Sequence, residues 1–170
     1  VIEITDMSPE KTVRAAENLI AAGAEALICA PADVASWNAV YNLCDEAGIY
    51  LLNDGAAQEI RPKSAPFIGT DSYAAGKKAA EYASKWIGEN YPGGVTVAHL
   101  TLPLFTDCVA RNKGFVETLE KLTKAPLKIV DENGRGAREP AMVAMENLLQ
   151  GNPEIQVVFG CNDDSALGAM

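Results

Sequence analysis

The sequence predicts an α/β protein with two lobes, each built on a parallel sheet covered by helices. Short apolar runs alternate with amphipathic segments of helical spacing along the whole chain. These runs are apolar throughout, which is typical of strands buried on both faces of a sheet. The aperiodic stretch at residues 55–66 reads as a connection and separates a block of three strand–helix units from a block of about four. Two α/β lobes are therefore expected.

The first block begins with residues 1–5, which we expect to form a strand. Ser8 supplies an N-cap and Pro9 a first-turn proline for a helix that runs to about residue 22. Asp33 caps a second helix, which ends at Gly48. Apolar runs bounded by turn residues place the other strands of this block at residues 26–30 and 49–53.

The second block opens with a short strand at residues 67–69 and a helix that begins at Asp71 and Ser72. That helix carries an apolar stripe which includes Ala79 and Trp86. The same alternation continues to the end of the chain. Further strands are expected at residues 95–100, 127–130 and 157–160, with helices at about residues 107–122 and 138–150 and the start of another after the last strand.

The charge balance limits the partners of this chain. Its 14 Lys and Arg residues are outnumbered by 23 Asp and Glu residues, for a formal net charge of −9. An acidic surface repels phosphate backbones. We therefore expect no direct contact between this segment and nucleic acid.

The residues that could support catalysis or hold a cofactor form no known constellation. The cysteines are Cys29, Cys44, Cys108 and Cys161. They include no C-x-x-C pair, so we expect buried structural thiols and no metal site. His99, the only histidine, lies in mid-strand and reads as a packing residue, with no nucleophile elbow beside it. Residues 132–140 lack the third glycine of a dinucleotide fingerprint, so no cofactor and no enzyme activity are expected.

Ligands of an open parallel sheet bind beyond the carboxyl ends of its strands, where side chains point into a crevice. This rule selects Asn53 and Asp54 after one strand and Asn162 after another. At Asn53 and Asp54 a functional and a structural role are equally open. Arg111 lies one turn into its helix, and its spacing alone suggests a side chain exposed to solvent. Four aspartates that precede helices are interpreted as capping residues, namely Asp6, Asp33, Asp71 and Asp163.

Five segments, in this order, carry a resemblance to a known family. They read "AENLIAAGAEALICAPAD", "AGIYLLND", "IGTDSYAAGKKAAEYASKWI", "ARNKGFVETL" and "AMENLLQGNPEIQVVFGCNDDSALGAM". Together they extend from about residue 17 to residue 170. The chain resembles the periplasmic sugar-binding proteins of the ribose-binding type, whose fold is shared with the effector domains of the lac repressor family.

The resemblance implies the type I periplasmic binding protein fold, in which three crossovers join two Rossmann-like lobes with parallel sheets. The N-terminal lobe would comprise residues 1–69 and the C-terminal lobe residues 70–170. Both lobes would be incomplete in this chain. The first strand and helix of the family fold would precede residue 1, and the rest of the second lobe would follow residue 170.

The resemblance also assigns ligand-binding roles. Asp54, with Asn53 as the alternative, matches an acidic residue that accepts hydrogen bonds from sugar hydroxyls. Arg111 matches an arginine before a Lys-Gly-Phe run, which makes it a hydroxyl donor. Asn162 matches the asparagine of a strand-ending "ND", and its amide can donate to one hydroxyl and accept from another. Thr70 matches a crossover position beside the ligand.

Two departures from the family pattern affect the choice of ligand. Ala30 stands where ribose-type members have an asparagine, and Gly136 stands where they have an aromatic residue. We therefore expect a pocket of different shape, which puts ribose itself in question. Phe105 is the candidate for stacking on the sugar, whereas Trp37 and Trp86 are interpreted as packing residues.

The function implied is that of an extracytoplasmic solute-binding receptor. It would capture a monosaccharide or related polyol in an interlobe cleft and deliver it to the membrane permease of an ABC transporter by hinge closure. We expect a monomer in the periplasm or outside the cell, and a lipid anchor is compatible with either location. The alternative is the ligand-sensing effector domain of a lac repressor family transcription regulator. A leader or lipoprotein signal upstream would favour the receptor, and a basic three-helix segment would favour the regulator.

Overall fold

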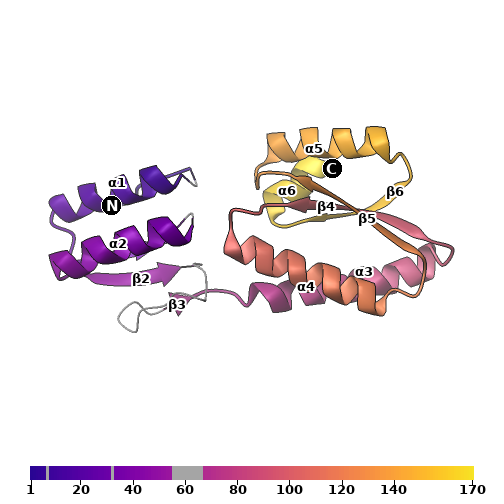
Figure 1. Ribbon diagram of the computed structural model, residues 1–170, viewed down its shortest axis with the longest axis horizontal. Helices are drawn as coiled ribbons and strands as arrows, with labels where there is room; N and C mark the ends of the chain where they lie inside the picture. Colours follow the sequence, from indigo (N-terminus) through magenta and orange to yellow (C-terminus); the bar gives the residue numbers. More distant parts are fainter. Residues whose placement is uncertain (7, 32, 55–66) are drawn as a thin grey trace. The chain divides into compact units, whose positions relative to one another are not determined.

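The computed structural model describes residues 1–6, 8–31, 33–54 and 67–170 (Figure 1). These residues form helices and parallel strands in alternation, which confirms the predicted fold class. Contacts divide the chain into two compact units. Unit 1 is Val1–Thr70 with Leu104–Asp107, and unit 2 is Asp71–Pro103 with Cys108–Met170. The connection expected at residues 55–66 lies outside the described residues.

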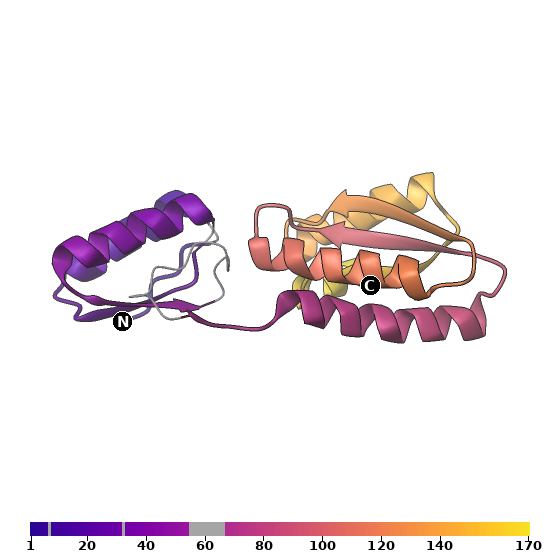
Figure 2. The same cartoon turned by 60° about the horizontal axis from the view of Figure 1, so that its bottom comes forward.

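Unit 1 contains one parallel sheet with the strand order β1-β2-β3. Its elements are α1 (Pro9–Ala21), β1 (Ala26–Cys29), α2 (Val34–Ala47), β2 (Tyr50–Asp54) and β3 (Phe67–Ile68). Trp37 and Val40 of α2 pack with Leu27 of β1 and Leu51 of β2 in a single core. The opposite face of the sheet carries Ile28, 73% exposed, and Tyr50, 82% exposed. Both helices lie on one face (Figure 2), so among the described residues this sheet is not covered on both faces as predicted.

Residues 1–5 do not form the predicted strand. Val1, Ile2 and Ile4 are highly exposed, and the segment shares no ladder with β1, β2 or β3. A strand is defined by hydrogen bonds to a neighbouring strand. Apolar composition was therefore not sufficient to place a strand here.

Unit 2 contains a parallel sheet with the strand order β5-β4-β6. Its elements are α3 (Ser72–Asn90), β4 (Val95–Thr101), α4 (Thr106–Leu122), β5 (Leu127–Asn133), α5 (Arg138–Gly151), β6 (Ile155–Gly160) and α6 (Asp163–Ala169). Val95 and Val97 of β4 pack in the same core as Phe115 and Leu119 of α4. Helices cover both faces of this sheet, as predicted (Figures 1 and 2). No helix in the described part of the chain is long and apolar enough to cross a membrane.

Three helices begin at the capping residues that the sequence predicts. Ser8, Asp33 and Asp71 accept hydrogen bonds from the first-turn amides of α1, α2 and α3. Asp6, also interpreted as a cap, instead forms an ion pair with Lys11 at 2.5 Å. The reason is that Ser8 lies immediately before α1 and accepts from the amide of Lys11 at 3.3 Å, so the cap position is already occupied.

Two glycines let the backbones of α3 and α4 touch. A Cβ atom at Gly76 would lie 2.0 Å from the carbonyl oxygen of Arg111, and one at Gly114 would lie 2.2 Å from the carbonyl oxygen of Tyr73. Neither position has room for a side chain. This contact holds the beginning of α3 against the middle of α4.

Gly114→Ala is expected to lower the free energy of unfolding by roughly 1 to 3 kcal/mol, because the new methyl group would force two backbones apart. Gly88→Ala in α3 is the matched control, since a Cβ atom there would meet no atom within 4 Å. That control should stabilise the protein by about 0.5 to 1 kcal/mol through helix propensity. Urea denaturation measures both changes, and equal effects of the two substitutions would contradict the close contact.

Candidate functional site

The candidate site lies where the strands of unit 2 end. All three strands are parallel, so their carboxyl ends meet at one edge. We call residues 102–103, 134–137 and 161–162 the carboxyl edge of unit 2. Backbone hydrogen bonds tie this edge together, because Gly134 N donates to Thr101 O at 3.1 Å and Cys161 N donates to Leu100 O at 3.1 Å.

Arg111 is fixed at the carboxyl edge of unit 2 by two hydrogen bonds. Its Nη1 atom donates to the carbonyl oxygen of Cys161 at 2.5 Å, and its Nη2 atom donates to Oγ of Ser72 at 3.3 Å. Ser72 is buried at the first turn of α3. The side chain is therefore half-buried and held, in contrast to the solvated arginine that spacing alone suggests. Two of the five guanidinium N–H donors are used, so three remain for a ligand.

Asn162 caps α6, which corrects the interpretation of Asp163 as the cap. The Oδ1 atom of Asn162 accepts from the amide of Ser165 at 2.9 Å. Its backbone is extended, with φ −146° and ψ 174°, as an N-cap requires, whereas Asp163 is already the first residue of the helix. The Nδ2 atom of Asn162 donates to the carbonyl oxygen of Gly136 at 2.9 Å. One amide hydrogen and one oxygen lone pair remain for a ligand.

Gly136 is required by the backbone of the carboxyl edge. Its φ angle is +69°, and a Cβ atom would lie 2.7 Å from Cδ2 of Leu102 and 3.3 Å from Nδ2 of Asn162. A larger side chain at this position would therefore displace Leu102 or Asn162. The positive φ angle and the lack of space for a Cβ atom explain why glycine stands here in place of the family's aromatic residue.

In unit 1, Asn53 and Asp54 lie at the carboxyl end of β2. Asn53 is 0% exposed and is paired in register with Cys29 of β1. Asp54 is exposed and is paired in register with Ile68 of β3. Side chains of neighbouring strand residues point to opposite faces. Of the two alternatives, Asp54 has the accessible side chain.

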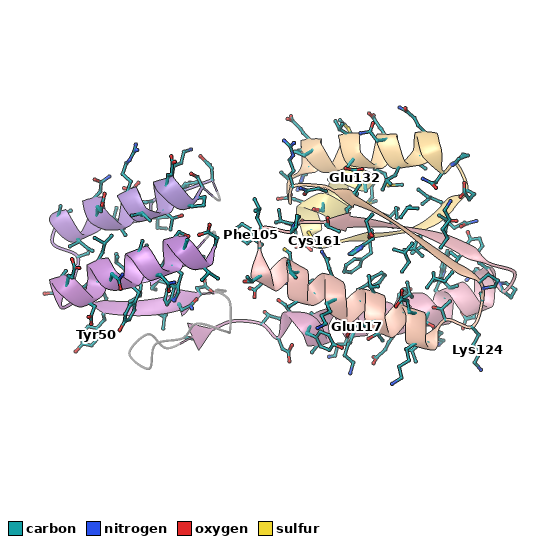
Figure 3. The ribbon with its side chains drawn as sticks, viewed as in Figure 1. Tyr50, Phe105, Glu117, Lys124, Glu132 and Cys161 are labelled. Carbon is teal, nitrogen blue, oxygen red and sulfur yellow. The ribbon has the colours of Figure 1, made fainter. Side chains whose placement is uncertain are left out.

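Thr70 and Phe105 occupy segments outside the helices and strands. Thr70 is exposed immediately before Asp71, the cap of α3. Phe105 is half-buried and directly precedes α4 (Figure 3). The structure thus brings Arg111 and Asn162 together through Cys161 in unit 2 and places Asp54 in unit 1. Their roles toward a ligand stay predictions.

Cys161 and its neighbours are functional candidates that sequence reasoning missed. A hydrogen bond with the Cys108 thiol, together with Ser165 and the charge of Arg111, lowers the pKa of Cys161 from 9.0 to about 7, against the opposing effect of burial. The Sγ atom lies 3.7 Å from Oγ of Ser165. The strand-end rule that selects Asn162 applies equally to the residue before it, but the effect of Cys108, Ser165 and Arg111 on its pKa depends on the fold.

His99 is a packing residue, as its position in mid-strand suggests. It is buried in β4, with ring centroids 6.2 Å from Phe115 and 5.7 Å from Phe159. Its Nδ1 atom lies 2.6 Å from Oδ1 of the exposed Asp131. Among the residues that the structure describes, no group of three or more His, Cys, Asp and Glu side chains is placed to hold a metal ion.

Comparison with known proteins gives a consistent set of relatives. A model of the periplasmic binding protein domain matches residues 2–170. The chain is 29% identical over 156 residues to the ribose import binding protein RbsB of Bacillus subtilis (strain 168), covering 91% of this chain and 48% of that protein. It is 27% identical over 172 residues to the D-ribose/D-allose-binding protein of Pseudomonas aeruginosa, covering 98% and 51%. A solved structure from Mycobacterium smegmatis in complex with β-D-fucofuranose has a TM-score of 0.83 and 28% identity, covering 95% of this chain and 54% of that one.

The parallel sheets, their order and these matches define the type I periplasmic binding protein fold. The chain belongs to the periplasmic binding protein domain family, because the family model matches nearly its whole length. Within this family it is similar to ribose-binding relatives, which confirms the resemblance found in the sequence. The chain spans about half the length of the curated relatives it matches.

Cys108→Ala is expected to raise the pKa of Cys161 above about 7, because it removes the largest of the effects that favour the thiolate. The thiolate absorbance in the ultraviolet, followed against pH, should therefore rise at higher pH in the variant than in the wild type. Cys29 should not interfere, since burial and then Cys44 raise the pKa of its thiol to about 11. Cys44→Ala is the control and should leave the step near pH 7 in place. A step that does not move in Cys108→Ala would contradict the hydrogen bond.

Proposed function

We propose that the whole protein is an extracytoplasmic solute-binding receptor that captures a monosaccharide or related polyol and delivers it to an ABC permease. The observation that carries this proposal is the held guanidinium of Arg111 beside Asn162, at the carboxyl edge of a parallel sheet. Sugar hydroxyls require several directed donors and acceptors, and this edge supplies both. The relatives named above are sugar-binding proteins, which supports the same ligand class.

The charged residues provide most of the proposed affinity. Hydrogen bonds to charged groups contribute roughly 1.5 to 3 kcal/mol each where water is excluded. Arg111 has three donors available, and the exposed carboxylate of Asp54 accepts on several lone pairs. Asn162 and Thr70 add neutral partners, and Phe105 offers an aromatic face for stacking. Asn53 is buried, so we assign to Asp54 the role of accepting hydrogen bonds from sugar hydroxyls.

Binding is favoured over catalysis and over transcriptional sensing. At the carboxyl edge, Arg111 and Asn162 present hydrogen-bond donors and an acceptor, which suit the recognition of sugar hydroxyls. The named relatives are import and sugar-binding proteins, which favours the receptor over the effector domain of a regulator.

The mechanism we propose is hinge closure between an N-terminal lobe, residues 1–69, and a C-terminal lobe, residues 70–170. A ligand that contacts both lobes binds the closed form better and shifts the equilibrium toward it. A permease can then distinguish the loaded receptor from the empty one. The family suggests a location in the periplasm or outside the cell. A monomer is expected, and a lipid anchor is compatible with this function.

Arg111→Ala and Asp54→Ala are each expected to weaken sugar binding about tenfold to a hundredfold, the loss of one or more charged hydrogen bonds. Isothermal calorimetry on the whole protein with D-ribose, D-allose and myo-inositol measures the affinity. The exposed Lys113, two residues further along α4, and the exposed Asp45 of α2 give the control variants Lys113→Ala and Asp45→Ala, which should bind as the wild type does.

Thermal unfolding of each variant separates lost binding from lost folding, because Arg111 also holds Cys161 and Ser72. Wild-type affinity in both Arg111→Ala and Asp54→Ala would rule out the proposed pocket. Absence of binding to any sugar or polyol by the wild-type protein would rule out the proposed ligand class.

A further inference from the structure

Ser72 ties Arg111 of α4 to the first residue of α3. The Nη2 atom of Arg111 donates to Oγ of Ser72 at 3.3 Å, although 39 positions separate the two residues in the sequence. Ser72 is 3% exposed, so its side chain is shielded from water. The hydroxyl is not needed to begin the helix, because Asp71 is the N-cap and accepts from the amide of Ala74 at 2.9 Å. Its oxygen is therefore available to the guanidinium.

We propose that Ser72 is a positioning residue for the proposed sugar site and that it influences the ligand only through Arg111. Its hydroxyl fixes the orientation in which the guanidinium presents its remaining donors. This inference rests on the proposed function, in which Arg111 donates to sugar hydroxyls. Because Ser72 is buried, we expect it to make no contact of its own with the sugar.

Two anchors are needed to define the orientation of a guanidinium. The bond from Nη1 to the carbonyl oxygen of Cys161, at 2.5 Å, fixes one point and leaves the group free to turn about it. The second bond, from Nη2 to Ser72, removes this rotation, since the guanidinium is planar and its donors form a rigid fork. The other N–H groups of Arg111 then have fixed directions before the sugar arrives. Such preorganisation lowers the conformational entropy that binding costs.

The contact between α3 and α4 keeps the serine within reach independently of its hydroxyl. The two helices lie side by side (Figures 1 and 2). Gly76 lies one turn after Ser72, and a Cβ atom there would be 2.0 Å from the carbonyl oxygen of Arg111. The hydroxyl of Tyr73 in α3 donates to Oε2 of Glu117 in α4 at 2.8 Å. Removing the hydroxyl of Ser72 should therefore release the guanidinium without separating the helices.

The first experiment observes the guanidinium in the whole protein without a ligand. Rotation about the Nε–Cζ bond exchanges the two Nη atoms, and hydrogen bonds at both atoms slow this rotation. Nitrogen NMR should therefore show separate Nη signals for Arg111, identified by their loss in Arg111→Lys. Ser72→Ala should make the exchange roughly fivefold faster or more, because one of the two bonds is lost.

The control for this experiment is Ser84→Ala, since Ser84 is a half-buried serine of the same helix. It should leave the exchange rate of the Arg111 signals unchanged. Thermal unfolding establishes that both serine variants are folded at the temperature of the spectra. An exchange rate in Ser72→Ala equal to that of the wild type would overturn the proposal. Averaged Nη signals in the wild type would overturn it as well, because the guanidinium would then not be held.

The second experiment asks whether Ser72 acts through Arg111. Calorimetry compares the wild type, Ser72→Ala, Arg111→Ala and the double variant, with whichever of D-ribose, D-allose and myo-inositol binds the wild type best. Ser72→Ala alone should weaken binding roughly threefold to tenfold, as expected for the loss of one hydrogen bond. In the Arg111→Ala background the same substitution should change the affinity by less than about twofold, because no guanidinium is left to position. Equal weakening in both backgrounds would contradict the positioning role.

Ser72→Thr is the conservative variant, because threonine retains a hydroxyl that can accept from Nη2. Both its affinity and its Nη exchange rate should lie within about twofold of the wild-type values. If Ser72→Thr exchanges as slowly as the wild type but binds as weakly as Ser72→Ala, the orientation of the guanidinium does not set the affinity. That result would overturn the proposal.

The proposed function and the positioning role fail in different ways. If the wild-type protein binds none of the three test ligands, the proposed function is wrong, while the NMR spectra still decide whether Ser72 holds Arg111. If the wild-type protein binds a sugar and Ser72→Ala binds it equally well, the positioning role is wrong and the proposed function stands.

Discussion

Parallel pairing of β4 with both β5 and β6 is the constraint on which the candidate site depends. Because all three strands run in one direction, the segments that follow them leave the sheet at one edge. Cys161 and Gly134 are tied to the end of β4 by backbone hydrogen bonds. Polar groups that are far apart in the chain thereby become neighbours, and the next residues are free to present donors and acceptors.

The contact between α3 and α4 completes the same edge from the side. Gly76 and Gly114 leave no room for side chains between the two backbones, so Ser72 at the start of α3 lies within reach of Arg111. The carbonyl oxygen of Cys161 supplies the second anchor of the guanidinium. An arginine held at two points loses less conformational freedom when it binds a ligand. The charge of the same guanidinium is one of the effects that lower the pKa of Cys161.

Much of the fold could be predicted from the sequence, because local signals and tertiary structure agree. Ser8, Asp33 and Asp71 cap their helices as their side chains suggest, and the apolar run of β4 is buried throughout. The predictions that failed concern partners that local pattern does not specify. Residues 1–5 are apolar but share no ladder with a described strand. Asp6 and Asp163 stand near helix starts, where Ser8 and Asn162 hold the cap positions.

The sequence by itself determined the alternation of strands and helices and the family. It also placed Asp54 and Asn162 near strand ends and Arg111 before a Lys-Gly-Phe run. These properties follow from the spacing of apolar residues and from local motifs, which need no distant contact to be read. Only the tertiary structure decided that Asn53 is buried while Asp54 is exposed, and that Arg111 is held by Ser72 and Cys161. The physical reason is that strand register and helix contact bring together atoms dozens of residues apart, and their hydrogen bonds and pKa shifts depend on that distance in space.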